Sequence, residues 1–154
     1  MTDVFTPAER SRVMASIRGR DTGPERAFAA LLRAYGVKHR RHARRLPGTP
    51  DFVVPTARLV IFIHGCFWHG HPACGKGKRL PKTRRTFWRA KIARNRARDA
   101  RDVRRLRNLD YAVFTFWECG LRGDRLPARL RTRLGLPKDP AGRPRAVVRE
   151  QSSA

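Results

Sequence analysis

Acidic residues, cysteines and long apolar segments are all scarce in this sequence. Only 12 of the 154 residues are Asp or Glu, whereas 36 are Lys or Arg, so the formal net charge is +24 at pH 7. A one-sided excess of this size repels itself in the compact state unless a polyanion offsets it, which favours nucleic acid as the partner. No apolar run approaches the roughly 20 residues of a membrane-spanning helix, and the first residues do not resemble a signal peptide. We therefore expect a cytoplasmic, nucleoid-associated protein with no membrane partner.

The three cysteines also limit the class of protein. An odd number argues against a closed disulfide framework and favours metal ligands or a free thiol in a reducing compartment. The composition is 40% hydrophobic, which is enough for a core, and the length is that of one ordinary domain.

Local patterns predict a mixed α/β architecture. Two Thr-x-x-Glu capping boxes, at residues 6–9 and 22–25, each contain a Pro in the first turn and predict helices over about 7–18 and 23–35. The helical period ends at Gly36, and a first strand is expected over 37–42. Apolar runs predict strands over 51–54, 58–63 and 111–117, and three- to four-residue spacing predicts helices from about 84 to 109 and from 124 to 134. We expect one domain, residues 1–134, with a central mixed sheet flanked by helices. Residues 135–154 contain three prolines and are expected to form a disordered basic tail.

Positive charge is concentrated in two segments. Residues 75–110 carry 15 Lys or Arg against three Asp, and residues 38–45 carry five more cations with no acid in the same segment. Such runs often do no more than cover a solvated helix face. Here they flank the apolar strands and a His- and Cys-bearing loop, so we interpret them as a surface that follows nucleic-acid phosphates.

The loop after the third predicted strand contains a metal-ligand pattern. Cys66, His71 and Cys74 form Cys-x4-His-x2-Cys, and the remaining cysteine, Cys119, follows the last strand. Three closely spaced ligands and one distant ligand are typical of a structural zinc site that attaches a loop to a sheet. The alternative is that Cys119 is a small buried hydrophobe and the loop thiols are incidental.

Two more histidines follow the same strand. His64 and His69 come directly after a strand that ends at Ile63, and Asp51 begins the neighbouring strand. A carboxylate at the start of one strand and imidazoles at the end of the next can converge into a hydrolytic metal site. Asp51 could equally be a turn residue after Pro50.

The motifs together resemble the very-short-patch-repair DNA mismatch endonucleases over about residues 10–134. The resemblance is carried by Pro47-Gly48-x-Pro50-Asp51-Phe52-Val53, Ile61-Phe62-x-His64-Gly65-Cys66-Phe67-Trp68-His69, Phe87-Trp88 with Asn95 and Arg98-Asp99, Trp117-Glu118-Cys119, and Arg20-Asp21-Thr22 with Glu25. It implies a restriction-endonuclease-like fold. It also implies magnesium-dependent nicking of duplex DNA on the 5′ side of the T in T·G mismatches, which arise when 5-methylcytosine deaminates.

The resemblance assigns a catalytic group. Asp51 would bind Mg²⁺ together with the backbone carbonyl of Ile63. His69 would activate or orient the attacking water, and His64 would assist at the hydrated metal or the scissile phosphate. Glu25 would support the metal cluster, although it is also the acidic residue of a capping box.

Aromatic and metal-binding roles follow from the same resemblance. Phe67, Trp68 and Trp88 would intercalate at the mismatch, because a mismatched step opens more cheaply than a paired one; for Trp88 the alternative is a core position. The cysteines and His71 match the structural Zn²⁺ site of the family.

The expected partner is double-stranded DNA with a T·G mismatch, bound by a monomer, and other DNA repair proteins are the second class of partner to consider. Two alternatives remain open at this point. One is a noncatalytic, zinc-stabilised nucleic-acid-binding module, and the other is a nuclease of the same fold with a different lesion preference.

Overall fold

The elements of the structure follow the predicted order in its central part. The computed structural model describes residue 6, residues 8–9 and residues 19–141. Its elements are α2 (Gly23–Ala34), β1 (Arg40–Arg41), β2 (Phe52–Val54), the 3-10 turn η1 (Pro55–Ala57), β3 (Leu59–His64), α3 (Gly75–Lys78), α4 (Arg85–Asn108), β4 (Ala112–Trp117), the 3-10 turn η2 (Glu118–Gly120) and α5 (Ala128–Leu134). The predicted helix over 7–18, beyond residues 8–9, and residues 142–154 of the predicted tail lie outside the described residues.

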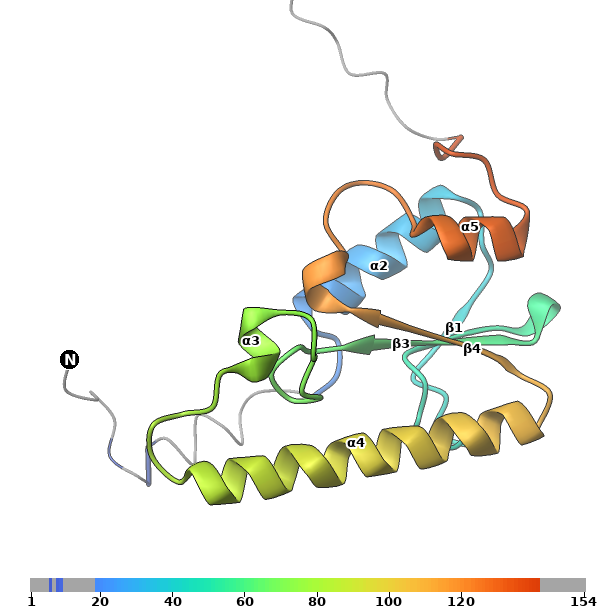
Figure 1. Ribbon diagram of the computed structural model, residues 1–154. Helices are drawn as coiled ribbons and strands as arrows, with labels where there is room; N and C mark the ends of the chain where they lie inside the picture. Colours follow the sequence, from blue (N-terminus) through green and yellow to red (C-terminus); the bar gives the residue numbers. More distant parts are fainter. Residues whose placement is uncertain (1–5, 7, 10–18, 142–154) are drawn as a thin grey trace, which may run out of the picture.

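Four strands form one mixed sheet in the order β1-β2-β3-β4. β2 is antiparallel to both β1 and β3, whereas β3 and β4 are parallel and are connected through α4 (Figure 1). The two strands with continuous apolar sequence, β2 and β3, are therefore central, as buried strands are expected to be. The structure confirms an α/β fold with a central mixed sheet.

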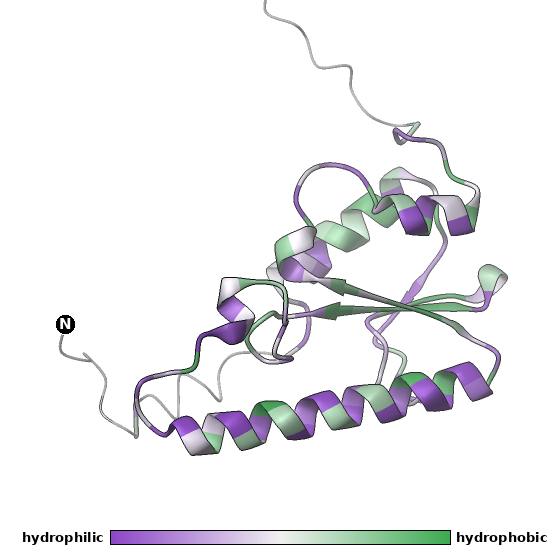
Figure 2. Ribbon diagram, in the orientation of Figure 1, coloured by the Kyte–Doolittle hydropathy of each residue, from purple (hydrophilic) through white to green (hydrophobic). Residues whose placement is uncertain are grey.

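Helices cover both faces of the sheet. α2 and α5 lie on one face, and α4 runs along the other (Figure 1). Side chains of a strand alternate between the two faces of a sheet. The face toward α2 and α5 carries Phe52, Val54, Leu59 and Ile61, and the face toward α4 carries Val53, Val60 and Phe62. The strands are accordingly apolar on both sides, while α4 is mostly hydrophilic (Figure 2).

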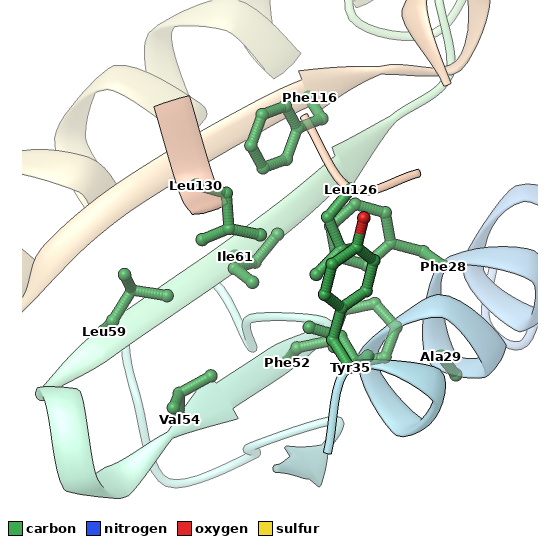
Figure 3. Packing of buried hydrophobic residues seen from close by; sticks show 11 residues of the cluster. Phe28, Ala29, Tyr35, Phe52, Val54, Leu59, Ile61, Phe116, Leu126 and Leu130 are labelled. Carbon is green, nitrogen blue, oxygen red and sulfur yellow. The ribbon is translucent and has the colours of Figure 1, made fainter. Parts of the chain in front are cut away.

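The larger core lies between the sheet and α2. The rings of Phe28 and Phe52 pack with centroids 5.5 Å apart and planes tilted by 40°, and Phe116 of β4 packs against Phe28 (Figure 3). Each fully buried Phe or Leu contributes about 1.5–3 kcal/mol to folding. These contacts fix the sheet to α2, the helix that carries Glu25 in its first turn.

Three predicted elements differ from the structure. The strand expected over 37–42 is reduced to Arg40–Arg41, because the N–H of Val37 is used to close the end of α2 on Leu32 O. The last helix begins at Ala128 rather than at residue 124, since Pro127 disfavours helical backbone in the residue before it. The segment expected to be a loop contains the short helix α3.

The first residues after α5 pack on the domain. Leu136 contacts the larger core, and the Tyr35 hydroxyl donates to the carbonyl of Lys138 at 2.7 Å. The domain boundary at residue 134 stays a prediction. Within the described part of the chain, no helix has both the length and the apolar character that crossing a membrane requires.

Candidate active site and metal-ligand cluster

Strand register brings Asp51 to the end of β3. β2 and β3 are antiparallel with Phe52 opposite Ile61, so the residue before β2 lies beside the last residues of β3. The N–H of Ile63 donates to Asp51 Oδ2 at 2.6 Å. Both residues line a cleft of about 790 Å³, which also contains His64 and His69. The predicted convergence of a carboxylate and two imidazoles is therefore present in the structure.

The environment of Asp51 disfavours its charged form. Burial raises the pKa of its carboxyl to about 6, and the nearby Glu25 carboxylate adds to this, while the Ile63 N–H, His69 and Arg41 lower it. A cation placed beside this buried carboxyl group would stabilise its ionised form more than it would stabilise that of a solvated carboxyl group.

His64 and His69 form a stacked pair. Their ring centroids are 3.8 Å apart and their planes differ by 7°. His69 Nδ1 lies 2.5 Å from Asp99 Oδ2 on α4, which fixes the orientation of the ring. Burial and the neighbouring His69 lower the pKa of His64 to about 4, so this ring is neutral at pH 7. For Asp99, burial opposes ionisation, but the contact with His69 outweighs it and lowers the pKa.

Glu25 closes the cleft from the side of α2. It is buried, and its carboxylate accepts hydrogen bonds from the Asp21 N–H at 2.9 Å and from the Thr22 hydroxyl at 3.1 Å. The Thr22 side chain makes no capping bond to the helix backbone, and Glu25 accepts the N–H of Asp21 instead of that of Thr22, so these contacts replace the two bonds expected of the second capping box. His42 Nε2 lies 3.7 Å from Glu25 Oε2.

The cysteines and His71 form one cluster at the carboxyl ends of β3 and β4. Because β3 and β4 are parallel and His64 is opposite Trp117, Cys66 and Cys119 each lie two residues beyond a paired residue, after adjacent strands. The ligand atoms of Cys66, His71, Cys74 and Cys119 all lie within 4.8 Å of one another. None of the cysteines is in a disulfide. We call these four residues the Cys/His cluster; it could hold a metal ion.

The loop between β3 and α3 is attached to the rest of the domain at several points. Asn95 of α4 donates to the carbonyl of Trp68 at 2.9 Å, and Glu118 accepts the N–H of Cys66 at 3.1 Å. The ring of His71 stacks on Trp117 at 4.2 Å. A Cβ on Gly77 would lie 2.1 Å from His71 O, so only glycine permits α3 to pack against this loop.

Phe67, Trp68 and Trp88 contact one another, and the two tryptophans line the cleft. Their ring centroids are 5.1 to 5.9 Å apart, and all three side chains are half-buried outside the two core clusters. We call them the aromatic trio. The Lys91 ammonium lies 5.6 Å from the ring centre of Trp68 and 5.4 Å from that of Trp88.

The second predicted group of cations is not free of acidic neighbours. Arg41 Nη2 lies 2.8 Å from Asp21 and 3.6 Å from Glu25, because β1 passes the beginning of α2. Part of the positive charge in residues 38–45 is thus paired with carboxylates of the same domain. The cations of α4 remain mainly exposed.

Comparison with known proteins identifies the family. A family model described as DNA mismatch endonuclease Vsr matches residues 2–76. The chain is 49% identical to DNA mismatch endonuclease Vsr of Escherichia coli K12 over 80% of this chain and 78% of the relative. The chain belongs to the Vsr family. It is also 46% identical to the Type II nicking enzyme V.XorIIP of Xanthomonas oryzae pv. oryzae, over 85% of this chain and 96% of that protein. As a Vsr-family protein it is a DNA endonuclease, and therefore a hydrolase whose partner is DNA.

Two residues of this Vsr-family cleft were not among the predicted site residues. The only sequence signal for a role of Asp99 is its place in the Arg98-Asp99 motif. Its contact with His69 depends on the packing of α4. His42 belongs to no recognised motif. It reaches Glu25 because its backbone is left-handed, with φ 51°, which spacing does not indicate.

Proposed function

We propose that this chain nicks duplex DNA 5′ of the T in a T·G mismatch by magnesium-dependent hydrolysis. The observation that carries the proposal is the convergence of Asp51, Ile63, His64 and His69 in one cleft beside the aromatic trio. This arrangement on a mixed sheet is what a restriction-endonuclease-like fold provides, and we propose that fold for residues 1–134.

The residues around Asp51 fit a magnesium ion. Mg²⁺ prefers oxygen ligands, keeps several waters and is usually held by one or two carboxylates. The N–H of Ile63 points to Asp51, and in an antiparallel pair the carbonyl of a residue faces the same neighbour as its N–H. Asp51 and the Ile63 carbonyl would thus bind the ion, with Glu25 supporting its waters. When bound, magnesium polarises the phosphate and lowers the pKa of a coordinated water.

The histidines supply proton transfer and orientation. The Asp99 carboxylate holds Nδ1 of His69, which leaves Nε2 as the atom that can accept a proton from the attacking water. His64, buried and neutral, would donate or accept a hydrogen bond at the phosphate without adding charge. Its place under the His69 ring also limits the movement of that ring.

We further propose that the Cys/His cluster binds structural zinc. Four ligands held about 2.0–2.3 Å from a tetrahedral Zn²⁺ lie roughly 3.3–3.8 Å from one another. His71 Nδ1 is 3.6 Å from Cys66 Sγ and 3.4 Å from Cys119 Sγ. The Gly77 N–H lowers the pKa of the Cys74 thiol to about 7, which favours the thiolate that a metal requires.

The test of this function is a nicking assay on a duplex panel. Substrates carry T·G, other mismatches or paired bases in varied flanking sequence, each with and without Mg²⁺. Nicking restricted to T·G and dependent on Mg²⁺ supports the proposal. Equal nicking of other mismatches would instead support a nuclease of the same fold with another lesion preference.

The aromatic trio is proposed to sense the mismatch by intercalation. We expect Trp68→Ala to reduce the preference for T·G over paired duplex by about tenfold or more, since a base stacked on an aromatic ring is worth about 1–3 kcal/mol. The measurement is the ratio of nicking rates on the two duplexes. Phe87→Ala, which removes an exposed ring next to Trp88, is the matched control and should retain the ratio. Equal losses on both duplexes in Trp68→Ala would contradict intercalation.

A monomer is the proposed working form, because the predicted site is completed by residues of one chain. Contacts with other repair proteins and association with the nucleoid are part of the same proposal. The exposed cations of α4 support the association with the nucleoid, since phosphate contacts are independent of sequence.

A further inference from the structure

The cleft is richer in carboxylates than in permanent cations. Among the described residues that line it, five are Asp or Glu and only three are Lys or Arg. The carboxylates are those of Glu25, Asp51, Asp99, Asp102 and Glu118, and the cations are Arg20, Lys91 and Arg98. This balance is the reverse of that of the whole chain, whose formal net charge is +24. A phosphate that enters the cleft therefore meets few protein cations.

Two of the three cations lie beside other groups of the cleft. The Lys91 ammonium lies against the aromatic trio, 5.4 Å from the ring centre of Trp88. Arg20 directly precedes Asp21, whose N–H donates to the Glu25 carboxylate, so Arg20 belongs to the α2 side of the cleft. Neither is next to the histidine pair in the chain.

Arg98 is the cation on the histidine side of the cleft. It lies on α4 directly before Asp99, the carboxylate that contacts His69 Nδ1. Burial and the neighbouring His69 are the main causes of the lowered pKa of His64, and the positive charge of Arg98 adds to them. The guanidinium is thus within electrostatic reach of both rings.

The guanidinium of Arg98 is not neutralised by the domain. Its side chain is 54% exposed, and within the described chain the one carboxylate closer than 4.0 Å is that of Asp99, whose Oδ1 lies 3.9 Å from Arg98 Nη2. This distance is too long for a hydrogen bond, and an exposed ion pair of this kind contributes little. Arg98 therefore keeps its N–H donors available for a ligand.

A second hollow on α4 meets the cleft at Arg98. Arg94 and Arg101 line this second hollow but not the cleft, whereas Arg98 lines both. Residues three and four apart are neighbours on a helix surface, so the three arginines form a row. Such a row suits the phosphates of one DNA strand, and Arg98 is its member that reaches the cleft.

We propose that Arg98 is a catalytic residue that binds the non-bridging oxygens of the scissile phosphate and stabilises the charge that they gain in the transition state. The water oxygen bonds to phosphorus while its proton passes to His69 Nε2. The bond from phosphorus to the leaving sugar oxygen breaks, and that oxygen takes a proton from solvent. The inference rests on the proposed function and adds the protein cation that Asp51 and the neutral His64 do not supply.

The chemistry of arginine fits this role. Its planar guanidinium offers two parallel N–H donors that match two phosphate oxygens, and its charge is permanent. Donors that are already in place where charge develops need no reorganisation during the reaction, which makes them an efficient source of transition-state stabilisation.

The test is single-turnover nicking of T·G duplex by the full-length, zinc-loaded chain with Mg²⁺, with duplex affinity measured in parallel. We expect Arg98→Gln to lower the rate at saturating enzyme at least about a hundredfold, which is the effect of removing one donor from an oxyanion site. Arg98→Lys keeps the charge without the paired donors and should recover part of the rate. Arg94→Gln and Arg101→Gln are the matched controls, because both side chains are exposed on the same row outside the cleft, and they should lower only the affinity.

A sulfur substitution in the DNA tests the contact itself. Sulfur is a weaker hydrogen-bond acceptor than oxygen, so a phosphorothioate at the scissile position should slow the wild-type chain in the diastereomer whose sulfur faces Arg98. The same diastereomer should slow Arg98→Gln much less, because that contact is already lost. Equal sulfur effects in the two proteins, for both diastereomers, would contradict the contact.

The outcomes separate this inference from the proposed function. A wild-type saturated rate in Arg98→Gln, with affinity lowered as in Arg101→Gln, overturns the catalytic role and leaves an ordinary phosphate contact. A loss of rate in Arg20→Gln but not in Arg98→Gln also overturns it and assigns the cation to the α2 side of the cleft. Failure of the proposed function is a different result, in which the wild-type chain binds T·G duplex and does not nick it.

Discussion

Asp51→Asn is expected to abolish nicking of T·G duplex while leaving DNA binding in place. The amide can still accept the Ile63 N–H, so the local fold is retained, but it removes the negative charge that a magnesium ion needs. A metal ion contributes several kcal/mol to the transition state of phosphoryl chemistry. Each 1.36 kcal/mol is a factor of ten in rate, so the loss should reach at least about a thousandfold.

The measurement for Asp51→Asn is single-turnover nicking, with duplex affinity determined in parallel. Asp110→Asn is the matched control, because Asp110 lies after α4, away from the cleft, in a left-handed conformation that Asn tolerates. If Asp51→Asn nicks at the wild-type rate, the proposed catalytic site is wrong. If the wild-type chain itself binds DNA but never nicks, the noncatalytic binding module becomes the better account.

Cys119→Ser is expected to release the metal and to unfold the loop that carries the histidines. Binding of structural zinc contributes about 10–16 kcal/mol in small peptides, which equals or exceeds the whole stability of an ordinary domain, about 5–15 kcal/mol. The wild-type chain should contain about one zinc per molecule, as a four-ligand site implies. The variant should contain far less and should melt at a lower temperature.

Zinc content and thermal unfolding are the two measurements for Cys119→Ser. Ala73→Ser adds a hydroxyl to the same loop at an exposed position between two ligands, and it should keep both the metal and the melting temperature. A Cys119→Ser protein that retains its metal would contradict the proposed ligand set. A metal-free wild-type protein with an intact fold would contradict the zinc site altogether.

Much of the sheet was predictable because its signals are local. The apolar run at residues 58–63 and the Pro-flanked segment 51–54 indicate central strands, and their antiparallel register brings Asp51 to Ile63. The capping box at 22–25 located the start of α2, although its hydrogen bonds differ from the expected pattern.

The parts that the sequence did not predict depend on packing between distant segments. Asp99 meets His69 only because α4 lies along the face toward which His64 points. Arg41 on β1 forms an ion pair with Asp21, which precedes α2, and His42 needs a left-handed backbone to reach Glu25. Such contacts leave no periodic trace in the sequence. The start of α5 is a different case, because Pro127 is a local signal in the sequence that disfavours helical backbone at the residue before it.

The short loop after β3 limits how this enzyme can be redesigned. Phe67 and Trp68 lie between His64 and His69, whose rings stack. Asn95 holds the carbonyl of Trp68, and the Cys/His cluster includes residues 66 and 71 of the same loop. One inserted or deleted residue between positions 64 and 71 would displace the aromatic rings and the histidines together. If the aromatic trio senses the mismatch as proposed, its preference is better altered by exchanging the rings at constant loop length, whereas length variation is more tolerable beyond Lys78, outside the segment that these contacts hold.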